Sequence, residues 1–186
     1  QWSKIEFIDL TKAWIAISIA FAMVISYDSQ TSLFSYDFIK WVLFSAVTVG
    51  VGFLLHEIAH KALAQKFHCW AEFRASNSML ILAVLISFLG FMFDSPFVLA
   101  APGAVMIRGG FLNKRRLGII SLAGPLTNLI LALIFLSFVP FSTGIIQKAA
   151  SYGFSINAWL ALFNLLPFGL FDGKKILSWN KKVYFT

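Results

Sequence analysis

The chain has 186 residues, of which 59% are hydrophobic and 12% are charged, and its mean hydropathy is +0.82. A soluble domain carries about 25% charged residues, so this composition argues against one, and its high hydrophobicity excludes a disordered chain. The formal charge is +7, but the basic residues lie between apolar runs, where membrane topology explains them better than nucleic-acid binding does. We therefore expect an α-helical polytopic membrane protein that forms a single domain, residues 1–186, in the lipid bilayer, with no nucleic-acid partner.

Four apolar segments predict membrane-spanning helices, because a span needs about 20 mostly apolar residues. In chain order they cover residues 10–27, 38–63, 117–139 and 154–171. Pro167 interrupts the fourth segment.

A further apolar stretch, residues 79–107, contains helix-breaking and polar residues, namely Asp94, Pro96, Pro102 and Gly103. We expect a helix over 79–93 and a return segment over 97–107, because irregular backbone at membrane depth is tolerated where protein or water covers it. Together with the four spans, this re-entrant loop or hairpin brings the prediction to about 4–6 membrane segments.

Residues 67–75 show a two-residue alternation typical of a strand. Phe67, Cys69, Ala71 and Phe73 alternate with more polar or aromatic neighbours. This pattern predicts a short strand at the membrane surface.

The basic residues also predict an orientation. If the N-terminus, residues 61–78, residues 108–116 and the C-terminal tail share one face, all of the 15 Lys and Arg residues except Lys40 and Lys148 lie on it. The positive-inside rule makes that face cytoplasmic. The predicted hairpin is compatible with this arrangement, because it enters and leaves on the same side.

The second predicted span contains His56, Glu57 and His60 in the pattern HEIAH. Histidines four residues apart lie on one helix face about one turn apart, so both imidazoles can bind one Zn²⁺. Glu57 lies beside them, where a carboxylate can act as a general base. The alternative is a chance pattern or a pair of hydrogen-bonded core histidines. Ionisable groups inside a membrane are costly and usually functional, which favours the metal site.

A catalytic zinc site needs a third protein ligand beside an open position. The candidates are His68, Cys69, Glu72, Asp94 and Asp172. All except Asp172 lie in the predicted strand or a predicted turn, where polar residues are ordinary. Asp172 ends a long apolar run and, like His60, lies next to basic residues of the same face, although it could also be a simple interfacial aspartate. Pro167 and Gly169 would break the helix before Asp172 and let the chain bend towards the metal.

Two amides lie inside apolar spans, Asn128 in AGPLTN and Asn164 in FNLLP. Each could form interhelical hydrogen bonds, or could hold a substrate carbonyl or stabilise an oxyanion. The packing that Gly124 and Pro125 indicate beside Asn128 favours a structural role there, and both readings stay open for Asn164.

The three motifs HEIAH, AGPLTN and FNLLPFGLFDG, in this order and all in apolar segments, resemble those of the site-2 protease family of intramembrane zinc metalloproteases. The resemblance covers about residues 39–175. The family's aspartate motif usually has Leu or Met before Asp-Gly, where this chain has Phe171.

This resemblance implies that His56, His60 and Asp172 bind one zinc ion per chain and that Glu57 is the general base. Asn164 matches an asparagine that assists catalysis near the metal. The resemblance thus implies a zinc endopeptidase.

The resemblance also implies a small β-rich, partly re-entrant substrate region next to the active site, formed by residues 67–75 and 97–107. The candidate substrate-binding residues are Gly103, Ala104, Val105 and Asn128. The implied substrate is a single-span membrane protein, cleaved within or near its transmembrane segment from a site near the cytoplasmic leaflet. Family members often carry a PDZ or CBS domain, and we expect neither in 186 residues.

Two other functions fit parts of this pattern. A prenyl-protein processing protease also places an HEXXH motif in a membrane helix, but it needs neither AGPLTN nor the Asp-Gly pair. A non-proteolytic zinc-binding membrane protein or a metal transporter is the non-enzymatic alternative. A transporter needs ligands at several depths along a pathway, whereas this chain concentrates them at one depth.

Overall fold

The computed structural model describes residues 2–98, 103–109 and 112–185. Three of its helices are long and apolar enough to cross a membrane, and they contain the first three predicted spans: Lys4–Asp28, Tyr36–Lys66 and Lys114–Phe141. The elements in chain order are α1 (Lys4–Asp28), α2 (Tyr36–Ser45), the π-helix η1 (Ala46–Gly50), α3 (Val51–Lys66), β1 (Trp70–Ala75), α4 (Asn77–Met92), β2 (Gly103–Arg108), α5 (Lys114–Phe138), the 3₁₀ turn η2 (Val139–Phe141), α6 (Gly144–Asn164), α7 (Asp172–Trp179) and α8 (Lys181–Phe185).

The fourth predicted span, residues 154–171, is not among the described helices that are long and apolar enough to cross a membrane. The helix in this region, α6, begins ten residues earlier, at Gly144, and ends at Asn164. Residues 165–171 are not helical, because Pro167 cannot continue a helix and Gly169 adopts a φ of +60°. The predicted break before Asp172 is confirmed.

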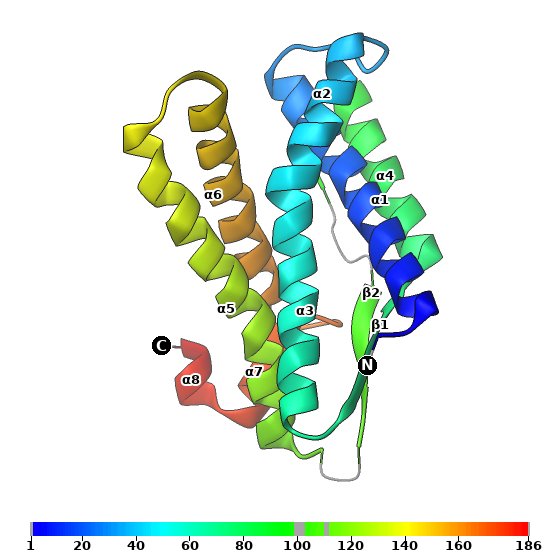
Figure 1. Ribbon diagram of the computed structural model, residues 1–186, viewed down its shortest axis with the longest axis vertical. Coiled ribbons are helices and arrows are strands. Elements are labelled where there is room, and N and C mark those ends of the chain that lie inside the picture. The colour runs from blue at the N-terminus through cyan, green and yellow to red at the C-terminus, as the bar shows by residue number, and fades with distance from the viewer. Residues whose placement is uncertain (1, 99–102, 110–111, 186) are drawn as a thin grey trace. The chain divides into compact units, whose positions relative to one another are not determined.

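The chain divides into two compact units. Unit 1 comprises Gln1–Val51 and Phe73–Ala104, and unit 2 comprises Gly52–Glu72 and Val105–Thr186. Within unit 1, α1 packs against α2 and α4, and within unit 2, α5 packs against α6 and α7 (Figure 1).

A two-stranded sheet is formed by β1 and β2, which confirms the predicted small sheet. Residues 99–102 of the predicted return segment, 97–107, lie outside the described residues. Gly103 approaches the backbone of Arg74 and Ala75, whereas Gly109 lies against Cys69, so the strands run antiparallel. β1 begins three residues later than predicted, at Trp70.

The late start of β1 follows from the way α3 ends. The amide of Cys69 donates to the carbonyl of Ala64 at 3.0 Å and that of His68 donates to Gln65 at 2.9 Å, while His68 has a φ of +58°. This pair of hydrogen bonds is a Schellman motif, with His68 in the left-handed position that glycine usually occupies. Cys69 and Ala64 also belong to one buried apolar cluster, the hydrophobic contact that accompanies this motif.

Two buried carboxylates of α1 bind the edge of β1 in unit 1. Glu6, which is 1% exposed, accepts a hydrogen bond from the Phe73 amide at 3.0 Å. Asp9 accepts one from the Ala75 amide at 3.3 Å. Because residues 73 and 75 direct their amides to the same side of the strand, α1 covers the β1 edge that faces away from β2.

The helix from Tyr36 to Lys66 contains a π-bulge at η1, where the regular hydrogen-bond ladder is interrupted. The Trp14 indole donates to the Ala46 carbonyl at 3.0 Å. A Cβ at Gly50 would collide with the same indole. Glycine is therefore needed at this close approach.

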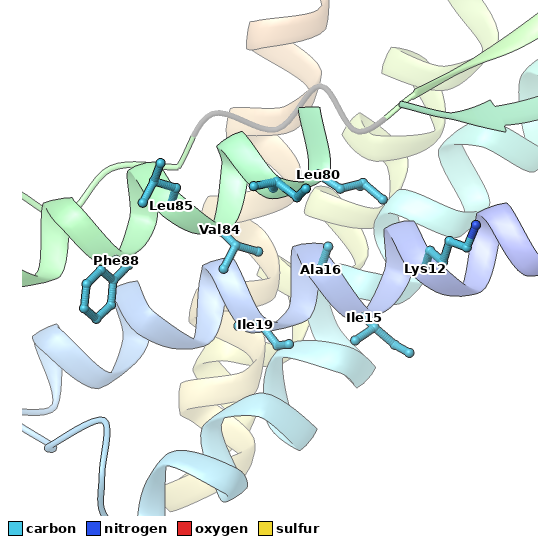
Figure 2. Close-up of a pocket in the computed structure, with 9 residues that line it drawn as sticks. Lys12, Ile15, Ala16, Ile19, Leu80, Val84, Leu85 and Phe88 are labelled. Carbon is cyan, nitrogen blue, oxygen red and sulfur yellow. The ribbon is translucent and has the colours of Figure 1, made fainter. Parts of the chain in front are cut away.

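Unit 1 also carries an apolar groove of about 590 Å³ between α1 and α4. Ile15, Ala16 and Ile19 of α1 and Val84 and Phe88 of α4 line it, and Figure 2 shows the two helices side by side with Lys12 near one end. Exposed aliphatic side chains of this kind suit contact with lipid.

Candidate metal centre

Three buried side chains of unit 2 converge with one ligand atom each. The Nε2 atoms of His56 and His60 are 3.0 Å apart. Asp172 Oδ2 lies 2.9 Å from His60 Nε2 and 3.6 Å from His56 Nε2. The structure thus brings together the three residues expected to bind metal.

The spacing of these three atoms fits a zinc ion. Tetrahedral ligands about 2.0–2.1 Å from zinc lie about 3.3 Å from one another, and the three distances range from 2.9 to 3.6 Å. Two imidazoles and one carboxylate also form a donor set found in catalytic zinc sites, which keep one position open. His56, His60 and Asp172 could therefore hold zinc.

Gly124 of α5 leaves the room that the ligand atoms need. A Cβ at this position would collide with Nε2 of both His56 and His60. The sequence pattern around Asn128 therefore includes a glycine that is required by close approach to the two imidazoles. Any larger residue would displace at least one ring.

The other ring nitrogen of each histidine is bound by α5. His60 Nδ1 lies 2.8 Å from the Ile120 carbonyl oxygen, and His56 Nδ1 contacts Asn128 Oδ1. Both partners accept, so in the neutral rings each Nδ1 carries the hydrogen and each Nε2 keeps a lone pair that a metal ion could use. Partners of this kind orient histidine ligands and raise their basicity.

Asp172 is the first residue of α7, where the helix dipole favours a carboxylate. Its second oxygen, Oδ1, pairs with Lys175 Nζ at 3.0 Å. Burial opposes ionisation, but the neighbouring imidazoles of His56 and His60, together with the Lys175 charge, hold the pKa of Asp172 well below its usual range. A lowered pKa favours the ionised carboxylate, the form that can bind a metal ion.

Gly173 fixes the start of α7. A Cβ there would collide with the backbone of Leu165 and Leu166, the residues that follow α6. The same Leu165 carbonyl accepts a hydrogen bond from the Tyr184 hydroxyl at 2.8 Å. In the Asp-Gly pair, a candidate ligand is thus followed by the glycine that lets its helix approach the end of α6.

Known proteins resemble this chain over most of its length. It is 38% identical over 188 residues to "Putative zinc metalloprotease MJ0611" of Methanocaldococcus jannaschii, covering 99% of this chain and 89% of that protein. It is 31% identical over 156 residues to "Putative zinc metalloprotease YwhC" of Bacillus subtilis, covering 71% of this chain and 66% of that protein. The chain belongs to this zinc metalloprotease family. No family model and no solved structure matches it.

Membership of a zinc metalloprotease family agrees with the His–His–Asp cluster. The expected general base, Glu57, is buried on α3 directly after His56. Asn164 is the last residue of α6 and is half-buried. Its Nδ2 donates to the Leu160 carbonyl at 2.9 Å.

The expected substrate-binding residues occupy different environments. Asn128 is fully buried, where it forms the interhelical hydrogen bonds considered as its structural alternative. Gly103 packs against the backbone of β1, and the Val105 side chain packs against a buried apolar cluster. Ala104 is exposed.

The other four candidate ligands, His68, Cys69, Glu72 and Asp94, are outside the metal cluster found among the described residues. His68 and Asp94 instead adopt positive φ angles just after α3 and α4. Sequence reasoning missed Asn157, a fully buried amide of α6 that bonds to Asn128. Its position in an apolar helix, two turns before Asn164, is a signal that could have identified it.

Proposed function

We propose that this protein is a site-2 protease-like intramembrane endopeptidase that hydrolyses peptide bonds within or near transmembrane segments of membrane proteins. The observation that carries the proposal is the position of the His–His–Asp cluster. Two of its ligands, His56 and His60, lie on a helix long and apolar enough to cross a membrane. A hydrolytic centre on such a helix is best suited to substrates that share the bilayer.

His56, His60 and Asp172 would hold one zinc ion per chain. When bound, zinc supplies a Lewis acid that polarises a carbonyl and lowers the pKa of water. Lys175 and the α5 acceptors keep the three ligand groups oriented, because they occupy the atoms that face away from the cluster.

Glu57 is the proposed general base and acid. It follows His56 on α3, the helix that carries both proposed histidine ligands. Its side chain is 8% exposed, so it is shielded from bulk solvent. Its carboxylate would take a proton from the attacking water and then return a proton to the departing amine nitrogen. This use of one carboxylate in two steps needs no second acid.

Asn164 is proposed to steady the oxyanion. One of its two amide hydrogens is used by the Leu160 carbonyl, which leaves the second available for substrate. The bond to Leu160 also restrains the side chain, as an oxyanion donor requires.

An extended substrate segment is proposed to pair with β2. A helical peptide hides its carbonyls in its own hydrogen bonds, so it must be unwound locally before cleavage, and pairing with a strand edge achieves this. Glu6 and Asp9 already bind the outer edge of β1. Within the part of the chain that the structure describes, this favours β2, including Gly103, Ala104 and Val105, as the pairing strand.

The proposed location is a multi-pass membrane protein with its active site near the cytoplasmic leaflet. The three long apolar helices support membrane insertion. The basic residues Lys61, Lys174 and Lys175 follow the ligands closely in sequence, which supports a cytoplasmic depth under the positive-inside rule.

The test is cleavage of a single-span reporter protein reconstituted with the full chain in liposomes. Wild type is compared with Glu57→Gln, and the fragments are separated by electrophoresis. We expect cleavage by wild type, none above background by Glu57→Gln, and about one zinc per chain in both by elemental analysis. Treatment with a zinc chelator should abolish wild-type activity. After the chelator has been removed, added zinc should restore the activity.

Wild-type cleavage rates in Glu57→Gln would overturn the assignment of the base. Zinc in both proteins without cleavage of any single-span reporter would instead favour a non-proteolytic zinc-binding protein or transporter.

A further inference from the structure

A chain of hydrogen bonds leads from His56 through two fully buried amides. His56 Nδ1 contacts Asn128 Oδ1. Asn128 Nδ2 donates to Asn157 Oδ1 at 3.0 Å, and Asn157 Nδ2 donates to the Gly153 carbonyl at 2.8 Å. The chain crosses α3, α5 and α6 and ends on a backbone group.

That backbone group fixes the direction of every bond in the chain. A carbonyl only accepts, so the Asn157 amide must turn Nδ2 towards Gly153 and Oδ1 towards Asn128. Asn128 must then turn Nδ2 towards Asn157 and Oδ1 towards His56. An amide oxygen also only accepts, so the hydrogen of neutral His56 lies on Nδ1 and its Nε2 is free to bind metal.

We propose that Asn157 is a positioning residue that acts through Asn128 to hold His56 in the tautomer whose Nε2 binds metal. The inference rests on the proposed function only in taking His56 as a zinc ligand. It does not depend on proteolysis or on the substrate.

Reversal of this chain of hydrogen bonds, the relay, is disfavoured at its Gly153 end. If the Asn157 amide turned over, its oxygen would face the Gly153 carbonyl, and turning Asn128 over as well would not remove that contact. Both amides are 0% exposed, so bulk water cannot repair this contact, and an unsatisfied buried polar group costs about 1–3 kcal/mol.

The packing around Asn157 supports a fixed side chain. A Cβ at Gly52 of α3 would collide with Asn157 Oδ1, so glycine lets α3 approach the amide closely. On α6, Gly153 lies against the Phe135 ring of α5, which a Cβ there would strike. Two glycines thus bring the three helices close at the relay.

His60 provides an internal comparison. Its Nδ1 lies 2.8 Å from the Ile120 carbonyl, a backbone acceptor that cannot turn over. The tautomer of His60 therefore does not depend on a side-chain relay, whereas that of His56 does. Changes at Asn157 should affect His56 and spare His60.

The first experiment measures zinc affinity of the purified full chain in mild detergent, by competition with a fluorescent chelator. Asn157→Leu, which has a similar volume but no polar atom, should weaken zinc binding about 10–100-fold. Asn157→Asp should restore most of this affinity, because a protonated carboxyl group can donate to Gly153 and accept from Asn128. Thr127→Val is the matched control, since the Thr127 hydroxyl donates only to Ala123 within α5.

A double-mutant cycle shows whether Asn157 acts through Asn128. The variant that combines Asn128→Leu with Asn157→Leu should bind zinc no more weakly than Asn128→Leu alone. Independent losses that multiply in the double variant would overturn the relay.

The second experiment reads the tautomer directly by ¹⁵N NMR of the metal-free protein. The share of His56 with hydrogen on Nδ1 should fall in Asn157→Leu and stay high in Asn157→Asp, with His60 unchanged in both. Equal zinc affinity in wild type and Asn157→Leu, or an unchanged His56 tautomer, would overturn the proposal. If Asn157→Leu does not fold, Asn157→Ser takes its place, because its shorter side chain cannot span from Gly153 to Asn128.

These outcomes are separable from failure of the proposed function. A wild type that binds zinc but cleaves nothing leaves both measurements intact. A wild type that binds no zinc overturns the metal-binding part of the proposal.

Discussion

His60 Nε2 lies 2.9 Å from Asp172 Oδ2, which connects the HEIAH helix to the first residue of α7. The contact uses one carboxylate oxygen, and Lys175 binds the other at 3.0 Å. The orientation of the Asp172 carboxylate is therefore set from both sides. Substitutions of the residues that surround His56, His60 and Asp172 are therefore expected to change zinc affinity.

Replacement of Lys175 by methionine should lower zinc affinity by about 10-fold, because outer-shell partners of this kind orient ligands. Lys175 binds Asp172 Oδ1, whereas the neighbouring Lys174 is exposed. Lys174→Met is therefore the matched control and should bind zinc as wild type does. Chelator competition measures both, and equal affinities in the two variants would contradict this role of Lys175.

Gly124→Ala should reduce zinc affinity about 100-fold or more, because the added Cβ collides with Nε2 of His56 and His60. Helix propensity alone would favour alanine over glycine by about 1 kcal/mol, so the loss cannot come from a weaker helix. Thr127→Ala on the same helix should leave zinc binding unchanged. Normal zinc affinity in Gly124→Ala would mean that the imidazoles lie elsewhere.

Glu6→Ala should destabilise the protein by about 1–3 kcal/mol, because it leaves the buried Phe73 amide without the acceptor it has in the structure. Hydrogen exchange measured by mass spectrometry should become faster in peptides that cover β1. Glu6→Gln keeps an oxygen acceptor and should show a smaller effect. Unaltered β1 exchange in Glu6→Ala would rule out the contact between α1 and β1.

His68→Gly should stabilise the protein by about 1 kcal/mol, because it removes the cost of a left-handed conformation at a non-glycine residue. His68→Ala keeps the Cβ and should give no such gain. Chemical unfolding in detergent measures the difference. Zinc affinity should be unchanged in both variants, and a loss of zinc would return His68 to the candidate ligands.

The sequence predicts the local structure well where the hydropathy pattern or a helix-breaking residue decides it. Three of the four predicted spans, the helix before Asp94 and the break before Asp172 follow from hydropathy, Asp94, Pro167 and Gly169. The start of β1 was misjudged, because the alternation extends into residues that complete the Schellman motif of α3. A backbone cap can occupy residues whose side-chain pattern continues that of a strand.

The outline of the candidate site is also local in origin. The four-residue spacing places His56 and His60 on one helix face because of the helical period, and the charge around Asp172 indicates a matching depth. The sequence could not predict that Asn128 contacts His56, nor that Asn157 lies behind it. Both contacts join side chains of different helices, and the spacing of the asparagines in the sequence does not predict which residues they contact.

The sequence by itself determined a membrane-type helical chain, the shared helix face of His56 and His60 and the helix break before Asp172, because hydropathy, helical period and helix breakers act within a few residues. Only the tertiary structure decided which atoms meet: Asp172 Oδ2 at the histidines, Gly124 beside their rings and Glu6 on β1. Such contacts depend on the packing of distant segments, where glycines set the distance between helices and buried polar groups must find partners in the fold.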